Sequence, residues 1–151
     1  MPTVGEYCSR DLVVAGRNDG MLAAAKRMRE RHVGCLIVVD EAEAGQRPVG
    51  ILTDRDIVVG VLAQSDRGLQ LVSVEDVMTA NVAVAQEDDD LSDALLRMRS
   101  FGVRRMPVVD GRGQLVGLIS FDDLVVYVQE EMNDLAELLG GGRRRERALR
   151  P

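Results

Sequence analysis

Aromatic residues are scarce in this chain, which has no tryptophan, two phenylalanines and two tyrosines among 151 residues. Single-stranded nucleic acid is held largely by stacking of its bases on such side chains. Basic residues are also the minority, because 19 lysines and arginines face 25 aspartates and glutamates, for a net charge of −6. Phosphate contacts require a basic surface. Both shortages disfavour nucleic acid as the main partner.

Cysteine and histidine are equally rare. Cys8 and Cys35 lie far apart, without the spacing of a metal or redox motif. We interpret both as buried or half-buried thiols of a reducing cytoplasm. His32 is the only histidine, so the usual Ser-His-Asp, Cys-His and histidine metal arrangements are missing. We expect His32 at the C-terminus of a helix.

Long apolar runs are absent as well. No stretch approaches the roughly 20 apolar residues that a membrane span needs, and residues 1–6 lack the basic region and apolar core of a secretory signal. We therefore expect a cytoplasmic protein with no membrane partner. The apolar share of 46% and the charged share of 29% are typical of a globular chain with a real core.

One unit is written twice in the sequence. Residues 21–40 align with 91–110 at a constant offset of 70, and eight of these positions are identical. After Asp40 the offset falls to 67, since Gly50 pairs with Gly117. The extra residues of the first copy lie within 41–48, as expected for a hairpin loop. The identical pairs are Ala24/Ala94, Arg27/Arg97, Met28/Met98, Arg29/Arg99, Val33/Val103, Val38/Val108, Val39/Val109 and Asp40/Asp110.

Each copy has a β-α-β-β-α pattern, which predicts an α/β (α+β) fold. Apolar residues at helical spacing predict helices over 21–31 and 91–101, and the repeated arginines on them are interpreted as solvated helix faces. One copy alone cannot bury its sheet, so the two should pack sheet against sheet. We expect repeat 1 over 1–69, repeat 2 over 70–139, and a linker at 65–71. The predicted strands are 12–15, 36–39, 49–52, 82–85, 106–109 and 115–119.

The last helix is predicted to be longer than its counterpart in the first copy. It carries an apolar stripe with acidic residues on the rest of its surface. We expect it to end at Gly140–Gly142, followed by a disordered basic tail; residues 140–151 are thus a Gly/Arg-rich tail. An anion or nucleic-acid tether is the alternative role for that tail. The stripe consists of Leu124, Val125, Val128, Met132, Leu135, Leu138 and Leu139.

The repeats share the motif Gly-aliphatic-aliphatic-Thr/Ser-x-x-Asp, at residues 50–56 and 117–123. A strand should run into a helix here, with the hydroxyl residue as N-cap and the acid in the first turn. Such a corner can also hold phosphate, and its carboxylate can accept hydrogen bonds from ribose. Capping alone and capping combined with ligand binding both remain open. Paired catalytic carboxylates are the disfavoured reading, because the acids are mirrored as cap residues.

Two such motifs in register resemble the pair of cystathionine β-synthase (CBS) domains called a Bateman module, over about residues 2–139. Residues 103–110 are similar to the family's second strand. The resemblance implies pseudo-two-fold symmetry and two clefts that bind adenosine compounds: AMP first, then ATP or ADP, NAD and S-adenosylmethionine. It implies a non-catalytic sensor that forms a homodimer, through Met132, Leu135 and Leu139, and an unknown protein partner. A ligand-free dimerisation scaffold is the alternative.

Family site residues carry over to this chain position by position. Since Arg104 and Arg105 correspond to uncharged Gly34 and Cys35 in the first copy, we expect the cleft with the arginines to bind nucleotide more strongly. Acids at Asp19 and Asp89, which belong to neither set of cleft residues, should repel phosphate unless they cap a helix or hold Mg²⁺. By resemblance, one cleft holds Ser120, Asp123, Arg104, Arg105, Val84 and Ala24. The other holds Thr53, Asp56, Arg55, Val14 and Ala94.

Overall fold

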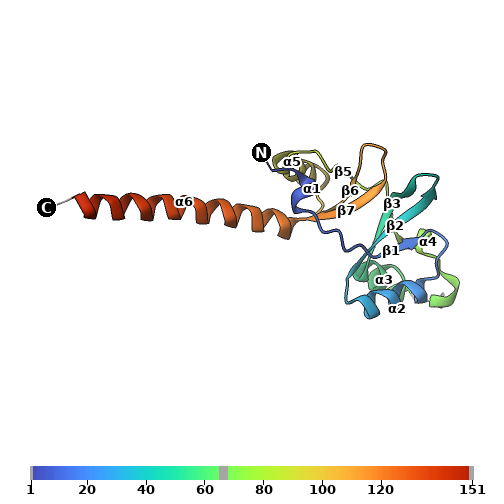
Figure 1. The fold of residues 1–151 in the computed structure, drawn as a ribbon. Helices are drawn as coiled ribbons and strands as arrows, with labels where there is room; N and C mark the ends of the chain where they lie inside the picture. Colours follow the sequence, from blue (N-terminus) through green and yellow to red (C-terminus); the bar gives the residue numbers. More distant parts are fainter. Residues whose placement is uncertain (1, 65–67, 150–151) are drawn as a thin grey trace.

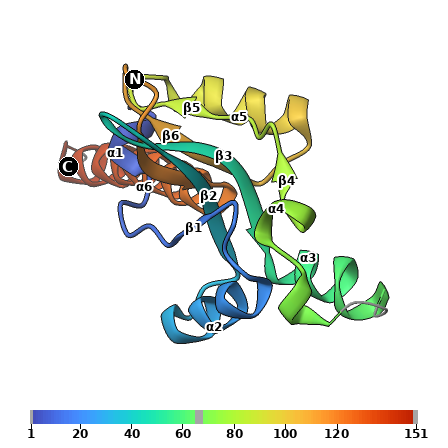
Figure 2. The same cartoon turned by 90° about the vertical axis from the view of Figure 1, so that its right-hand side faces the viewer.

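The computed structural model describes residues 2–64 and 68–149 (Figure 1). Residues 1, 65–67, 150 and 151 lie outside the described part, so the expected linker is described only from Gly68 onward. The fold is mixed α/β with two sheets, of four and three strands. In Figure 2 the strands lie in the middle, with α5 (Leu91–Phe101) on one side and α2 (Met21–Arg31) and α3 (Asp54–Gly60) on the other.

The first sheet has the order β1-β2-β3-β4. β1 (Val14–Gly16) runs parallel to β2 (Cys35–Ala42), and β2 forms a long hairpin with β3 (Gly45–Thr53). The second sheet has the order β5-β6-β7 and repeats this arrangement. Its strands are β5 (Ala85–Gln86), β6 (Arg105–Val109) and β7 (Leu115–Ser120). The β2–β3 hairpin is the longer one because it contains the extra residues of the first copy.

Each repeat exchanges its opening segment with the other repeat. The short helix α4 (Val74–Val77) and β4 (Thr79–Ala80) belong to the second copy in sequence, yet β4 pairs with β3 of the first sheet. Conversely, α1 (Val4–Tyr7) lies against the second repeat, and Ser9 bridges Leu118 of β7. The structural halves are therefore interlocked rather than divided at one point of the chain.

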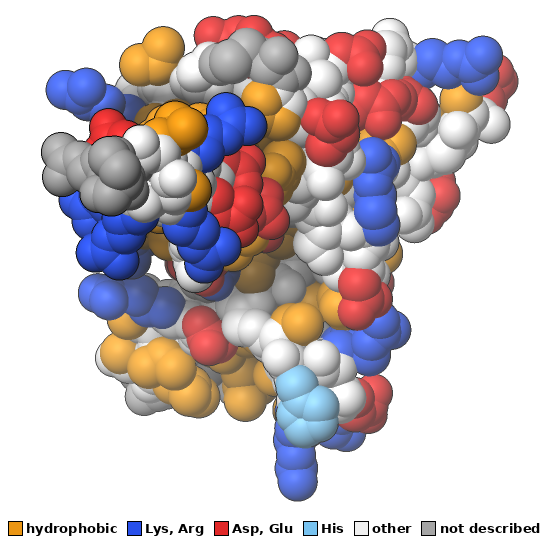
Figure 3. Space-filling view, turned by 60° about the vertical axis from the view of Figure 1, so that its left-hand side comes forward, with side chains coloured by type: hydrophobic (Ala, Val, Ile, Leu, Met, Phe, Trp, Pro, Cys, Tyr) orange, Lys and Arg blue, Asp and Glu red, His pale blue; other side chains and the backbone are white. Residues whose placement is uncertain are grey.

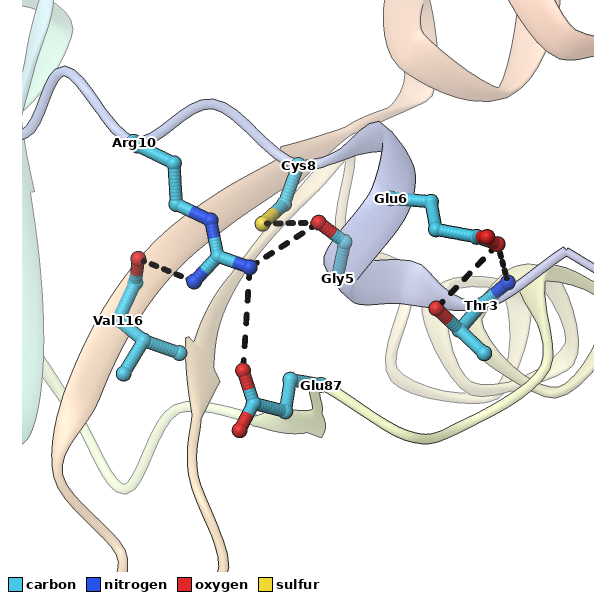
Figure 4. A network of polar contacts seen from close by, with 7 residues as sticks. All are labelled: Thr3, Gly5, Glu6, Cys8, Arg10, Glu87 and Val116. Atoms are coloured by element: carbon cyan, nitrogen blue, oxygen red, sulfur yellow. Dashed lines mark hydrogen bonds and ion pairs between the residues drawn. The ribbon is translucent and has the colours of Figure 1, made fainter.

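Backbone hydrogen bonds fix both exchanged segments in the same way. Val4 N donates to Asp89 O at 2.8 Å, and Val74 N donates to Asp19 O at 2.9 Å. Around α1, the guanidinium of Arg10 donates to Val116 O at 3.1 Å and to Gly5 O at 3.0 Å (Figure 4). These bonds tie the start of the chain to strand β7 of the opposite repeat.

Each structural half has its own apolar core, and each core contains side chains from both copies. The first core buries one face of α2, namely Met21, Ala24 and Met28, and includes Val72 and Val74 from the second copy. The second core buries the equivalent face of α5. It includes Val4 from the first copy, which is fully buried. Since each core is completed by the other copy, neither repeat can bury its sheet alone.

Helices α2 and α5 end alike. Their C-caps, His32 and Gly102, adopt the left-handed conformation with φ of 53° and 65°. That conformation closes the last helical turn and is easiest for glycine. The position expected for His32, at a helix C-terminus, is confirmed. The two connecting 3₁₀ turns are η1 (Leu62–Gln64) and η2 (Leu69–Leu71).

The last helix, α6, runs over Phe121–Leu149 and leaves the rest of the molecule as a long rod (Figure 1). The predicted end at Gly140–Gly142 was wrong, as was disorder over residues 143–149. Each glycine costs about 1 kcal/mol relative to alanine in a helix, but none of them blocks its geometry. The residues that follow are mainly arginine, glutamate, alanine and leucine, which favour helix, and arginines also suit the negative end of the dipole. In the described residues, no helix combines the length and apolarity needed to cross a membrane.

Candidate functional site

Both motif corners are closed by reciprocal capping. Thr53 Oγ1 accepts a hydrogen bond from Asp56 N at 3.1 Å, and Thr53 N donates to Asp56 Oδ2 at 2.9 Å. In the second copy, Ser120 N donates to Asp123 Oδ2 at 2.7 Å and Asp123 N donates to Ser120 Oγ at 3.3 Å. These bonds fix each carboxylate at a strand-to-helix corner through a single oxygen, Oδ2.

A cavity of about 230 Å³ lies at the first corner, and we call it cleft 1. Thr53 and Asp56 contribute from the first copy, whereas Arg104 and Arg105 contribute from the second. The cleft therefore combines a hydroxyl, a carboxylate and two guanidinium groups from opposite repeats. Its remaining walls are Ile51, Thr79, Val82, Ala83 and Val103.

A second cavity, of about 260 Å³, is the pseudo-symmetric counterpart, cleft 2. Leu118 of β7 takes the place of Ile51, while Gly34 and Cys35 take the places of the two arginines. Arg105 lies between the clefts and lines both. The other lining residues are Asp11, Leu12, Val13, Val33 and Ile37, and neither Ser120 nor Asp123 is among them.

The structure groups the expected site residues differently from the sequence. We expected Arg104 and Arg105 beside Ser120 and Asp123. Their backbones are indeed close, because Arg105 pairs with Ser120 across the β6–β7 ladder. The arginines nevertheless line the cleft of Thr53 and Asp56. The physical reason is the packing of the two sheets, in which β3 contacts β7 and the end of β3 faces the start of β6.

Five other expected residues lie outside these two clefts. Ala24 and Ala94 have no exposed surface and pack in the cores of their own repeats, so the cleft-lining position expected for them was wrong. Val14 lines a separate groove beside Asp19 and Arg27. Arg55 is exposed in the first turn of α3. Val84 is half-buried, and its carbonyl oxygen accepts a hydrogen bond from Arg97.

Sequence reasoning also missed a repeated ion pair. Arg97 Nη1 donates to Val84 O at 2.6 Å and to Asp89 Oδ2 at 3.0 Å. Arg27 does the same with Val14 O, at 2.6 Å, and Asp19 Oδ2, at 3.2 Å. The interpretation of these arginines as solvated helix faces was wrong. Each arginine neutralises the acid that was expected to repel phosphate. The signal available in the sequence was that the arginines and the acids recur at the same offset of 70 residues.

Charge and burial differ between the two clefts. Arg104 stacks over the ring of Phe121, with its guanidinium carbon 5.7 Å from the ring centroid, a cation–π contact that orients the side chain. Burial raises the pKa of the Cys35 thiol, against a smaller lowering effect of the nearby Arg105 charge. Cleft 2 therefore presents a neutral thiol where cleft 1 presents cations. No cluster of three or more His, Cys, Asp or Glu side chains suited to a metal occurs among the described residues.

The CBS domain model matches residues 4–63 and 74–130, once for each repeat. This chain belongs to the CBS domain family. A relative in Methanopyrus kandleri, the uncharacterized protein MK0525, is 31% identical over 144 residues, which cover 91% of this chain and 71% of the relative. The two-sheet fold with interlocked repeats is thus that of a CBS domain pair.

Solved CBS structures share this architecture. The CBS domain pair of MJ0100, in complex with 5′-methylthioadenosine and S-adenosyl-L-methionine, has a TM-score of 0.70 and 29% identity, covering 83% of this chain and 98% of that one. CBSX2 in complex with AMP has a TM-score of 0.70 and 25% identity, with coverage of 87% and 99%. CBS pairs similar to this one therefore bind compounds that contain adenosine.

Proposed function

We propose that this CBS pair is a non-catalytic, cytoplasmic regulatory module that binds an adenosine compound in cleft 1. AMP is the first choice, followed by ADP or ATP, NAD and S-adenosylmethionine. The observation that carries the proposal is the composition of cleft 1: Asp56 and Thr53 from one repeat lie with Arg104 and Arg105 from the other. The two ligand-bound relatives described above support the same ligand class.

Each part of a nucleotide has a suitable group in this cleft. A carboxylate such as Asp56 accepts hydrogen bonds from ribose hydroxyls, while Thr53 offers a further polar atom. Guanidinium groups form charge-assisted, two-pronged hydrogen bonds with phosphate. Apolar side chains of Ile51 and Val103 provide walls for the base. Cleft 2 is lined by only one of the two arginines, Arg105, and by neither Ser120 nor Asp123, so cleft 1 is the stronger site for a phosphorylated ligand.

Ligand binding would couple the repeats, because the groups in cleft 1 come from both of them. A bound nucleotide favours the arrangement in which Asp56 and Arg105 reach it together. It shifts the balance between two arrangements only as far as its affinities for them differ. An unidentified protein partner would then respond to that arrangement.

A ligand-free scaffold is the second candidate, and the exposed apolar stripe of α6 favours it. Val128, Met132, Leu135 and Leu139 are each more than half exposed. A surface of this kind suits association with another chain. In that reading pairing or docking is the whole function, and the clefts stay empty.

Calorimetric titration with AMP separates the two candidates. Asp56→Asn removes the charge but keeps an oxygen that can accept the capping bond. Asp123→Asn is the matched control, because Asp123 has the same capping role at the other corner and does not line cleft 1. We expect wild type and Asp123→Asn to bind alike, and Asp56→Asn to bind about tenfold more weakly, as for loss of a hydrogen bond to a charged group. Equal binding by all three, or none by wild type, would overturn the proposal.

A further inference from the structure

No other part of the described chain packs against helix α6 over most of its length. From Val128 to Leu149 every residue is exposed, and the helix projects away from both sheets (Figure 1). In proteins most helical stability comes from burial of an apolar face, and an isolated helix in water is only marginally stable. A second helix packed on α6 would supply that burial.

The apolar side chains of α6 follow a heptad spacing of three and four residues. We call this line of positions the seam. Two positions interrupt its apolar character, a glycine at 142 and a glutamate at 146. The seam consists of Val125, Val128, Met132, Leu135, Leu139, Gly142, Glu146 and Leu149.

Charge is divided along the same helix. The part before Gly140 carries Glu130, Glu131, Asp134 and Glu137, whereas the part after Gly142 carries Arg143, Arg144, Arg145 and Arg147. Figure 3, in which the left-hand side of Figure 1 comes forward, shows basic side chains gathered around the end of the rod. Glu131 and Arg145 flank the seam on the same side, two heptads apart, whereas Arg144 points away from it.

We propose that two copies of the chain pair through antiparallel α6 helices, with Glu131 of each copy beside the partner's Arg145. Antiparallel pairing brings the acidic part of one helix onto the basic part of the other. A parallel pair would place arginines beside arginines and acids beside acids, which costs affinity. The antiparallel pair also has a two-fold axis, so it closes as a dimer.

Charge and length select one register. When Val125 faces the partner's Leu149, the seam overlaps along its full described length and Leu135 faces the partner's Leu139. The same register puts Glu131 two residues, or about 3 Å along the axis, from the level of the partner's Arg145 and on the same side of the seam. A shift by one heptad in either direction shortens the overlap and removes this ion pair. The chosen register also sets flexible Met132 against the space left by the partner's Gly142.

Sedimentation equilibrium of the full chain tests the pairing, and it is independent of any ligand in cleft 1. Arg145→Glu makes both inter-helix pairs repulsive, so we expect the dimer Kd to rise about tenfold. Arg144→Glu is the matched control, with the same charge change off the seam, and should leave the Kd unchanged. The double variant Glu131→Arg/Arg145→Glu swaps the charges and should restore dimerisation.

Several results would overturn this proposal. A monomeric wild type at micromolar concentration would do so, whether or not it retains nucleic acid on its arginines. So would equal effects of Arg144→Glu and Arg145→Glu, or no recovery in the double variant. Cooperative denaturant unfolding of each variant verifies that the two cores still fold, which substitutions on exposed α6 should not change.

Disulfide trapping tests the orientation separately, in a Cys8→Ser/Cys35→Ser background. In the proposed register Leu138 lies beside the partner's Leu138, so Leu138→Cys should form a disulfide-linked dimer. The two copies of Val128 lie about 27 Å apart along the axis, at 1.5 Å per residue, so Val128→Cys should not. The reverse outcome, trapping at 128 and none at 138, would show a parallel pair and overturn the proposal.

Discussion

Asp56 of the first repeat and Arg105 of the second repeat line the same cleft, although 49 positions separate them in the sequence. The sequence places each of them at the corner of its own copy. Sheet packing brings them together, because the end of β3 meets the start of β6. Binding of a ligand that contacts both groups thus depends on the relative position of the two repeats.

The motif glycines allow the exchanged segments to approach β3 and β7. A Cβ at Gly50 would lie 2.9 Å from Thr79 O and 2.7 Å from Met78 Sδ. We therefore expect Gly50→Ala to reduce the free energy of unfolding by about 1–3 kcal/mol, as for overpacking. Gly111→Ala is the control, because nothing lies within 4 Å of its Cβ position. Denaturant unfolding measures both, and equal stabilities would show that β4 can move away at no cost.

The internal arginines should contribute to stability rather than to ligand binding. Arg97→Met keeps the apolar stem but removes the donor to Val84 O and Asp89. We expect a loss of about 1–2 kcal/mol in the free energy of unfolding, as for removal of a charged hydrogen-bond partner. Arg99→Met, on the exposed side of the same helix, should change stability by less than about 0.5 kcal/mol. Thermal unfolding of the two variants checks the difference, which vanishes if Arg97 is solvated.

Tyr7 of α1 forms a hydrogen bond to α6, and we expect its phenol to ionise at a higher pH than that of an ordinary tyrosine. Its hydroxyl donates to Glu130, and this hydrogen bond is the main cause that raises the pKa of Tyr7 to about 12. The folded state then holds the phenol proton more tightly than the unfolded state, whose ordinary pKa is 10.0. This contribution to stability is full below pH 10.0 and is lost as the pH rises toward about 12.

Ultraviolet titration of the phenolate absorbance checks this expectation. Wild type should show one tyrosine that ionises near pH 12, and Tyr7→Phe should lack that step. Glu130→Gln should bring the step down toward the ordinary value, because both the carboxylate hydrogen bond and its charge are removed. A Tyr7 step at the ordinary pKa in wild type would show that the bond to Glu130 does not persist in solution.

The pKa of the Cys35 thiol in cleft 2 depends on the position of the Arg105 charge. Burial raises the pKa of the Cys35 thiol, and the Arg105 charge lowers it in part. Arg105→Gln should raise this pKa further, so that Cys35 reacts more slowly with iodoacetamide at neutral pH, since only the thiolate reacts. Arg29→Gln, at an exposed site on α2, is the control. Unchanged alkylation in Arg105→Gln would place the Arg105 guanidinium away from cleft 2.

Much of the fold could be predicted from local pattern. The duplication, the capping roles of Thr53 and Ser120, and the buried faces of α2 and α5 follow from residue spacing and helix-start chemistry, and all are present in the structure. These features depend on contacts within a few residues of the chain. Periodicity detects such contacts directly.

Contacts between distant segments could not be predicted in this way. The exchange of Val4 and Val74 between the cores, the bond from Arg97 to the preceding strand, and the regrouping of Arg105 with Asp56 all depend on how the sheets pack. The sequence of one repeat does not specify which acceptor binds an arginine that is predicted to be exposed. The continuation of α6 past Gly140 was missed for another reason: glycine weakens a helix without ending it when the following residues favour helix.

The central claim is that cleft 1 joins a ribose-binding acid from one repeat to phosphate-binding arginines from the other. The most direct test is the ratio of AMP affinity to adenosine affinity, measured by calorimetry in wild type and in Arg105→Gln. We expect wild type to prefer AMP by about tenfold or more, and Arg105→Gln to lose most of that preference while it binds adenosine as before. An unchanged preference in Arg105→Gln, or no preference in wild type, would contradict the claim.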